Sequence, residues 1–551
     1  MGQAAVAVDS VDDGRLWTWC RDGGVSNNQL WPGVCPMTGR GLHATSGAGE
    51  LLLRVPARLL YNTRTIHADP LLGPLLSEAA AATGGVLLSP LATLCFGLMH
   101  ERARAAASRW EPFLASFPAE MVAAVQLTPI ELATVPWALE LHAEAAEQHA
   151  RLVKVCSIVA ELLRWADSDD AQRSPGVAAW HAITGPQRDR DFGRERVLWA
   201  WSVISTRACY MRCSPPLFAG STSSFEQQRP SAVPMVQDSA LEADVSTLVP
   251  WLDLLNHVSS RHSATASFVA DKSHSTNRAE DLATTGSYEV HSVLPIASGS
   301  PVFLSYGEGM ANELLLARYG FVDPNHPSDV APVPQLELLL QLATERRCCP
   351  VSDSSAVSTS TGGELSRGAL HCRGEQFCWQ CKECLLRSTC LSEVGLYPLE
   401  ASGTLAFLTP PAAATPTTTG GDSEDSDDRC RSDDMSTIVS WNMLTIARVL
   451  TARGSPLSLE LLRQPTLADT AISAACERQA LLLLRELAMR LITQVSLAEP
   501  TCMGGAEGAA TEAQLAAKQR QVLLRMLAEG RVATLSKAQV AIENQIAAIT
   551  Q

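Results

Sequence analysis

The sequence lacks a long hydrophobic run, a basic N-terminal segment, a cluster of lysines and arginines, and an internal repeat. No stretch approaches the ~20 consecutive apolar residues that a membrane-spanning helix needs, so we expect no transmembrane segment. Asp9, Asp12 and Asp13 replace the basic start of a secretory or organelle-targeting peptide, which predicts that the chain carries neither. Without a segregated basic patch, the sequence also predicts no direct binding to nucleic acid.

Acidic residues prevail, because 43 Lys and Arg against 58 Asp and Glu give a formal net charge of −15. Acidity suits a basic partner, such as a lysine-rich protein segment, and it equally serves solubility. Hydrophobic residues make up 46% and charged residues 18%, so the chain can build large cores and is not wholly disordered. The 16 cysteines, in a chain for which we predict no secretion, indicate a reducing compartment.

The 551 residues correspond to roughly three or four domain-sized units. A short strand is predicted over residues 49–56, behind a glycine-rich turn at 39–41. Residues 89–212 have helical periodicity, and strands return at about 247–322.

The C-terminal part predicts three helices, which we expect to form a bundle. Their apolar patterns cover about 481–495, 515–527 and 535–549. Four stretches rich in Ser, Thr, Pro or acidic residues predict surface insertions that cannot order themselves by burial: 219–240, 271–287, 351–368 and 409–434.

Three motifs carry groups suited to a polar ligand. Asn256 and His257 end an apolar run and offer an amide and an imidazole, although a turn with local capping would also explain them. Tyr306 follows an apolar strand and precedes a glycine, so its hydroxyl can enter a cleft or be satisfied in a core. Arg207 lies at the edge of an apolar helix face and needs an anion, which a protein or a ligand carboxylate could supply.

Taken together, the order of the motifs resembles the SET-domain protein methyltransferases. The motifs are GRGL (39–42), GELLLRVP (49–56), WAWSVISTR (199–207), DLLNH (253–257) and SYG…N…YGFV (305–322). More narrowly, the sequence is similar to the branch typified by the Rubisco large-subunit lysine methyltransferase. The resemblance covers roughly residues 30–330 well and 440–551 weakly.

The resemblance implies an α+β chain, with a β-rich SET fold that holds a helical insertion and is followed by an all-α substrate-binding domain. The implied division is an N-terminal extension (1–30), a SET domain (31–330) with its insertion at about 89–212, a low-complexity linker with a cysteine-rich segment (331–436), and a helical C-terminal domain (437–551).

The resemblance also assigns site residues. Tyr306 matches the family's catalytic tyrosine, and Arg207 matches the arginine that faces the carboxylate of S-adenosyl-L-methionine. The remaining residues implied to bind this cofactor are Arg40, Gly41, Glu50, Leu51, Leu52, Asn256, His257, Tyr319, Gly320 and Phe321.

The activity implied is methyl transfer to a lysine amine of a protein, either a histone or another basic protein. The attacking amine must be neutral although its unperturbed pKa is ~10.4, and an apolar channel beside a sulfonium charge disfavours the ammonium form. The hydroxyl of Tyr306 would then orient the reacting groups rather than act as a strong base. We expect a monomer in the cytoplasm, the nucleus or both, with no membrane attachment.

Two alternatives stay open. The chain could be a non-catalytic SET-fold interaction protein, a role that acidic and low-complexity insertions would suit. It could also be a protein-histidine methyltransferase, because one relative in this branch methylates a histidine of actin. That relative holds the histidine with an asparagine two residues after the arginine, and this sequence has Cys209 there.

A cysteine-rich segment separates the two matching regions. Its CxxCxxC core has spacings that suit a tetrahedral zinc site, and the candidate ligands are Cys372, Cys378, Cys381, Cys384 and Cys390. An iron–sulfur cluster, or a segment without any metal, would fit the same spacing.

Overall fold

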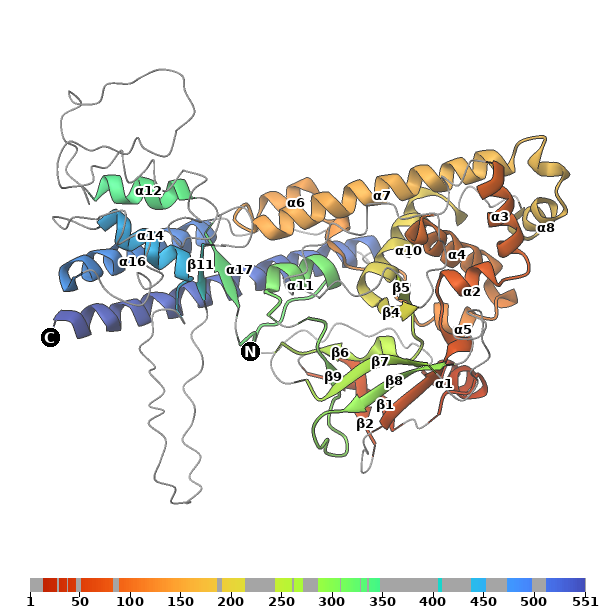
Figure 1. Cartoon of the computed structure of the whole chain (residues 1–551), viewed down its shortest axis with the longest axis horizontal. Helices are drawn as coiled ribbons and strands as arrows, with labels where there is room; N and C mark the ends of the chain where they lie inside the picture. The colour runs from red at the N-terminus through yellow and green to blue at the C-terminus, as the bar shows by residue number, and fades with distance from the viewer. Residues whose placement is uncertain are drawn as a thin grey trace.

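A computed structural model describes residues 13–550 with gaps. The residues outside the description are 1–12, 27–28, 37, 46–50, 83–88, 186–190, 214–242, 260–261, 271–285, 308, 328, 334–335, 347–404, 409–437, 452–472, 498–511 and 551. In the described part, a strand-rich region lies beneath a layer of helices, and a second group of helices lies at the opposite end of the molecule (Figure 1). The predicted α+β class is confirmed. Within the described ranges, no helix combines the length and hydropathy needed to cross a bilayer.

Short strands form the strand-rich region. The hairpin pairs β1 (Leu30–Cys35) with β2 (Gly39–Ala44), and a three-stranded antiparallel sheet has the order β3 (Leu51–Pro56), β8 (Gly286–Ser292), β7 (Ala264–Ala270). Two further pairs are β4 (Cys209–Cys213) with β5 (Ala243–Thr247), and β6 (Asn256–His257) parallel to β9 (Phe303–Leu304). The strand predicted near 49–56 is confirmed over its described residues.

The helical insertion, predicted from the periodicity over 89–212, corresponds to helices between residues 90 and 207, whereas residues 209–212 belong to strand β4. Its helices are α4 (Pro90–Arg104), α5 (Glu111–Leu114), α6 (Pro129–Ala133), α7 (Leu139–Ala166), α8 (Pro175–Thr184) and α10 (Arg194–Arg207), and α2 (Thr63–His67) and α3 (Leu72–Ala82) precede them. Local sequence explains several starts: Ser89 caps α4 ahead of a proline, and Thr128 forms a capping box with Glu131 on α6.

One core joins the strands to the insertion. It also includes Leu16 and Cys20 of α1 (Asp13–Asp22), which are 1% and 0% exposed. Part of the stretch predicted as an N-terminal extension is therefore packed against the SET-like region. The run 248–255 differs from the predicted strand, because it forms a turn and a 3-10 helix (Leu252–Leu254) before β6 begins.

A helix also interrupts the strands predicted at 247–322. This helix, α11 (Asn312–Tyr319), ends at Gly320, which has a φ of 77°. A Cβ atom at this position would lie 1.9 Å from the carbonyl oxygen of Val122, so both the conformation and the contact require glycine.

The C-terminal helices are α12 (Leu336–Glu345), α14 (Trp441–Thr451), α16 (Ala474–Leu497) and α17 (Glu512–Thr550), and β10 (Val330–Pro332) pairs with β11 (Ala406–Leu408) beside them. The two helices predicted at 515–527 and 535–549 are wrong as separate elements, since α17 is continuous over 39 residues. The apolar stripe of α17 changes partner along its length. Leu524 and Leu527 pack near α7 and α11, whereas Leu535 and Ile542 enter the C-terminal core.

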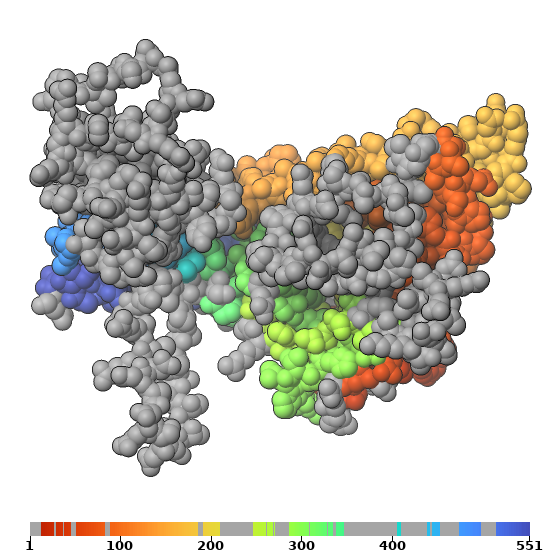
Figure 2. Space-filling model, viewed as in Figure 1, coloured from red at the N-terminus to blue at the C-terminus, as the bar shows by residue number. Residues whose placement is uncertain are grey.

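The two long helices α7 and α17 connect the ends of the molecule. In the space-filling view α7 (orange) runs from the insertion toward the C-terminal helices (Figure 2).

The C-terminal core also contains Ala331, Leu339 and Phe407, so described parts of the predicted linker pack with the C-terminal helices.

Candidate active site

The segment from Asp253 to His257 is held against the β1–β2 hairpin. The side-chain nitrogen of Asn256 donates to the backbone oxygen of Arg40 at 2.9 Å and to the hydroxyl of Thr38 at 3.1 Å. A Cβ atom on Gly41 would lie 2.5 Å from that same nitrogen. Glycine at position 41 therefore leaves the room that the amide of Asn256 needs.

Tyr306 reaches this segment from β9. Parallel pairing of β6 with β9 places Tyr306 beside His257, whose Nδ1 accepts a hydrogen bond from the backbone nitrogen of Tyr306 at 3.0 Å. The Tyr306 hydroxyl donates to the backbone oxygen of Leu255 at 2.6 Å. Two separate stretches of chain thus place a phenol, a carbonyl oxygen and an imidazole together.

Aromatic rings surround Tyr306. Its ring centroid lies 4.8 Å from that of Tyr319, 5.2 Å from that of His257 and 6.3 Å from that of Phe321. The hydroxyl of Tyr319 donates to the backbone oxygen of Tyr306 at 3.3 Å. The left-handed turn at Gly320 makes this cluster possible, because it ends α11 and directs the chain from Tyr319 to Phe321 along the site.

Burial sets the protonation of the two central groups. It raises the pKa of Tyr306, so the phenol stays protonated and can donate a hydrogen bond. Burial lowers the pKa of His257, so its imidazole is neutral at physiological pH. Because Nδ1 of His257 accepts from Tyr306, its proton is on Nε2, which lies 3.2 Å from the hydroxyl of Ser259.

Arg207 forms an ion pair within the protein. Its Nη1 lies 3.1 Å from Oδ2 of Asp253 and donates to the backbone oxygen of Asp253 at 3.3 Å. The Asp253 side chain is fully buried, and burial raises its pKa while Arg207 opposes that rise. The anion predicted for Arg207 is thus present as a protein carboxylate, and the Nε of Arg207 is buried without a hydrogen-bond partner in the described part of the chain.

Known proteins with similar sequences indicate what this chain resembles. SET domain-containing protein 4 of Mus musculus is 28% identical over 321 residues, covering 58% of this chain and 60% of that protein. Its Homo sapiens counterpart is 27% identical over 315 residues, covering 57% and 59%. This chain is similar to SET domain-containing protein 4. The resemblance to SET-domain proteins predicted from the motifs is confirmed, and the match spans about three fifths of those relatives' length.

Further comparisons are more distant. The actin-histidine N-methyltransferase of Drosophila melanogaster is 25% identical over 320 residues, covering 56% of this chain and 49% of that protein. The solved structure of the SET domain of LSMT bound to lysine and AdoHcy is 15% identical, covers 98% of this chain and 92% of its own, and has a TM-score of 0.44. No family model matches the chain.

The other predicted SET residues are spread more widely. Arg40 contributes its backbone oxygen to Asn256 and pairs its guanidinium with Asp13. Leu51 and Leu52 lie in β3, where their backbone oxygens accept hydrogen bonds from Gln29. Within the described part of the chain, neither leucine hydrogen-bonds to the Tyr306 cluster.

Several of the predicted residues lie outside the described part of the chain. Glu50 lies outside the described residues, as do Cys372, Cys378, Cys381, Cys384 and Cys390. The described ranges contain no group of three or more His, Cys, Asp or Glu side chains placed to hold a metal ion.

Sequence reasoning missed Asp253, the carbonyl oxygen of Leu255, Thr38 and Asp13. The motif containing Asn256 and His257 also contains Asp253, so an acidic residue in that motif was an available signal. Thr38 and Asp13 had no signal, since only the fold brings them to the site.

Proposed function

We propose that this protein is an S-adenosyl-L-methionine-dependent protein-lysine N-methyltransferase with Tyr306 as its catalytic residue. The observation that carries the proposal is the arrangement around Tyr306: its hydroxyl donates to the Leu255 carbonyl, and the rings of His257, Tyr319 and Phe321 surround its ring. The relationship to SET domain-containing protein 4 supports it.

The residues present fit the proposed cofactor. The amide nitrogen of Asn256 is fixed by Arg40 and Thr38, and its carbonyl oxygen has no hydrogen-bond partner among the described residues, so it can accept from an ammonium group. Arg207 keeps a buried Nε without a partner and can donate to a carboxylate. When bound, S-adenosyl-L-methionine would supply a methyl group on a positively charged sulfur.

The side chains of this site perform the positioning. Because its pKa is raised by burial, the Tyr306 hydroxyl acts as a hydrogen-bond donor and not as a base. The rings of Tyr319 and Phe321 exclude water, which favours the neutral form of an entering amine. The Leu255 oxygen has a second lone pair that can accept from that amine, so the nucleophile is aligned rather than chemically activated.

Methylation of histidine is a second candidate, because one relative is named an actin-histidine N-methyltransferase. The relevant position here is Cys209, whose thiol is hydrogen-bonded with Tyr288. Burial raises the pKa of Cys209 to about 11, so the group is a neutral thiol, which is a weaker hydrogen-bonding partner for an imidazole than an amide is. This chemistry favours lysine as the substrate residue.

The decisive experiment labels a cell extract with tritiated S-adenosyl-L-methionine and the full-length chain, then identifies the modified residue by mass spectrometry. Label on lysine supports the proposal, and label on histidine supports the second candidate. Cofactor binding in calorimetry without transfer to any protein would favour a non-catalytic role and contradict the proposal.

The variant Tyr306→Phe tests the residue assignment. Loss of the hydroxyl that holds the Leu255 oxygen in place for the reacting amine should lower the transfer rate about 10²–10³-fold, with cofactor affinity nearly unchanged. Tyr61→Phe is the matched control, because the buried hydroxyl of Tyr61 has no hydrogen-bond partner among the described residues and its ring packs against Trp110. Equal transfer rates for Tyr306→Phe and Tyr61→Phe would remove Tyr306 from the mechanism.

The proposal extends to partners and location. A chain with a formal charge of −15 suits a basic protein substrate, such as a histone, presented to a monomeric enzyme in the cytoplasm or nucleus. The labelling experiment identifies the protein, and its compartment then indicates where this enzyme works.

A further inference from the structure

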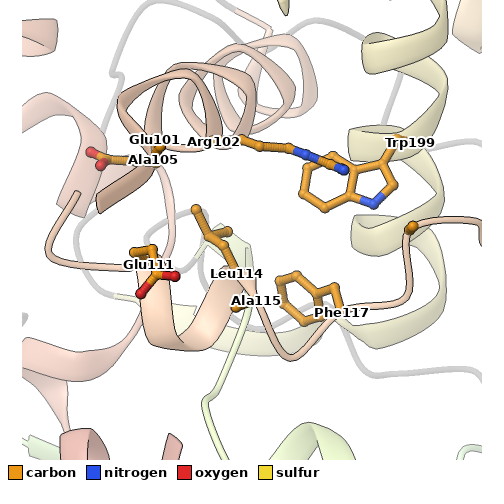
Figure 3. A pocket seen from close by; sticks show the side chains of 9 residues that line it. Glu101, Arg102, Ala105, Glu111, Leu114, Ala115, Phe117 and Trp199 are labelled. Atoms are coloured by element: carbon orange, nitrogen blue, oxygen red, sulfur yellow. The ribbon is translucent and has the colours of Figure 1, made fainter. Parts of the chain in front are cut away.

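A pocket of about 290 Å³ lies inside the helical insertion, between α4, α5 and α10 (Figure 3). It is lined by Glu101, Arg102, Ala105, Glu111, Leu114, Ala115, Phe117, Ala119 and Trp199. Phe117 separates it from the candidate active site, because the Arg207 guanidinium carbon lies 5.6 Å from the centre of the Phe117 ring. The pocket adjoins that site without sharing Tyr306, Asn256 or His257.

Arg102 supplies the positive charge of the pocket. Its guanidinium carbon lies 4.0 Å from the centre of the Trp199 ring, which is itself anchored by a hydrogen bond to the backbone oxygen of Pro118. The Nη1 of Arg102 is buried and has no hydrogen-bond partner among the residues that the structure describes. No carboxylate of the described residues lies within ion-pair distance of Arg102, although Glu120 and Asp191 act on it from farther away.

The acidic residues of the pocket are already compensated. Glu101 accepts a hydrogen bond from the hydroxyl of Ser108 at 2.6 Å and lies 3.6 Å from Arg104. Glu111 pairs with both terminal nitrogens of Arg15. Of the charged side chains that line the pocket, Arg102 is thus the one without an ionic partner in the described part of the chain.

A half-buried guanidinium with a buried, unpaired nitrogen is stabilised by an anion, and charge-assisted hydrogen bonds to a carboxylate suit it well. Arg196 increases the need of Arg102 for an anion, because burial and this neighbouring arginine together lower the pKa of Arg102 to about 10. The face of Trp199 offsets part of the cost, as a cation–π contact does.

We propose that this pocket binds a small organic carboxylate with an apolar or aromatic body. The carboxylate would pair with Arg102, and the body would lie against Leu114 and Phe117 (Figure 3). Glu101 and Glu111 line the same pocket, on the side opposite Trp199 in that view, and each added negative charge on a ligand increases its repulsion from them, so a doubly charged phosphate is disfavoured relative to a carboxylate. The volume suits a ligand at the small end of the usual range.

The experiment follows 4-fluorophenylacetate by fluorine NMR during titration of the full-length chain. Its neutral analogue 2-(4-fluorophenyl)ethanol and its phosphate analogue 4-fluorophenyl phosphate test the charge requirement. We expect the carboxylate to bind more tightly than either analogue. Absence of binding, or equal binding of the alcohol, would overturn the proposal, and tighter binding of the phosphate would overturn the assignment to a carboxylate.

Three variants locate the binding. Arg102→Gln should weaken the carboxylate about tenfold or more, as loss of a charge-assisted hydrogen bond does. Arg164→Gln removes the same charge from an exposed position of α7 and should leave binding unchanged. Ala115→Trp fills the pocket from an exposed position, keeps Arg102, and should also abolish binding. Unchanged affinity in Arg102→Gln and Ala115→Trp, with wild-type melting temperatures, would refute the site.

Discussion

Arg531 of α17 lies at the joint between the SET-like region and the C-terminal helices, and its removal should destabilise the protein more at high pH than at neutral pH. Its Nη1 lies 3.2 Å from Oε1 of Glu313 on α11, and both side chains are almost fully buried, at 3% and 4% exposed. Its Nη2 donates to the backbone oxygen of Pro332, and its guanidinium carbon lies 4.6 Å from the centre of the Trp137 ring.

The titration of Glu313 sets the size of the effect. Burial raises its pKa from 4.5 to about 7, with a smaller contribution from Glu140, although Arg531 pulls it down. Because this folded-state pKa lies above the unfolded value, the wild-type protein loses stability as the pH rises from 4.5 to about 7, and the contribution of Glu313 is constant above that. Arg531→Met removes the downward pull, so the carboxyl keeps its proton to higher pH.

Two terms give the expected destabilisation. At pH 7 the main loss is the donor to the Pro332 oxygen, and an unpaired buried carbonyl costs about 1–3 kcal/mol. Above pH 7 the unfolded Glu313 is ionised, and for as long as the folded carboxyl of the variant keeps its proton each pH unit adds about 1.4 kcal/mol. At pH 9 the added destabilisation is therefore at most about 3 kcal/mol.

Urea denaturation of the full chain at pH 7 and pH 9, followed by helical circular dichroism, measures this difference. Arg525→Met is the control, because Arg525 lies on the same helix and its ion pair with Glu529 is exposed, so we expect less than about 1 kcal/mol at either pH. The double variant Arg531→Met/Glu313→Gln should lose the added pH dependence. A destabilisation by Arg531→Met that is equal at pH 7 and pH 9 would refute the role given to Glu313.

Two further substitutions test local features. Gly41→Ala should push the amide of Asn256 away from the Arg40 oxygen and weaken cofactor binding in calorimetry. Gly176→Ala is the control, because the nearest atom to its new Cβ would be 3.5 Å away, and it should leave binding intact. Equal cofactor affinities of the two variants would contradict the role given to Gly41. Burial lowers the pKa of His100 from 6.5 to about 4, so the unfolded chain takes up a proton first and stability falls by about 3 kcal/mol as the pH drops from 6.5 to about 4. His100→Leu should remove that part of the acid sensitivity in urea denaturation, and an unchanged acid dependence would show that His100 is not its source.

The SET-like arrangement was predictable because its motifs are local in sequence and distinctive in order. Asn256, His257 and Tyr306 each follow or interrupt an apolar run, which marked them as candidates, and the structure brings all three together through β6 and β9. The β-rich region and the helical insertion could also be predicted, because the alternating pattern of strands and the periodicity of helices differ over long stretches of sequence.

The continuous α17 could not be predicted from periodicity. Leu524, Leu527, Leu535 and Ile542 lie on the same face of one helix but enter two different cores, and the buried charged residue Arg531 between them interrupts the apolar pattern, so it resembles two shorter helices. The partner of Arg207 could not be predicted either. The sequence shows that a buried guanidinium needs an anion, but it does not show which carboxylate lies next to it. Asp253 lies beside Arg207 only because α10 packs against the segment that contains the 3-10 turn.

The amino-acid sequence by itself determined the strand near 49–56, the helices of the insertion and which side chains can donate, accept or carry charge, because those properties depend on residue type and on neighbours along the chain. The tertiary structure alone decided the contacts between distant residues: the Tyr306 hydroxyl on the Leu255 oxygen, the Asn256 amide over Gly41, and Arg102 on Trp199. Those contacts depend on how whole elements pack, and burial in that packing shifts the pKa values of Tyr306, His257 and Glu313 from the ordinary values of their residue types.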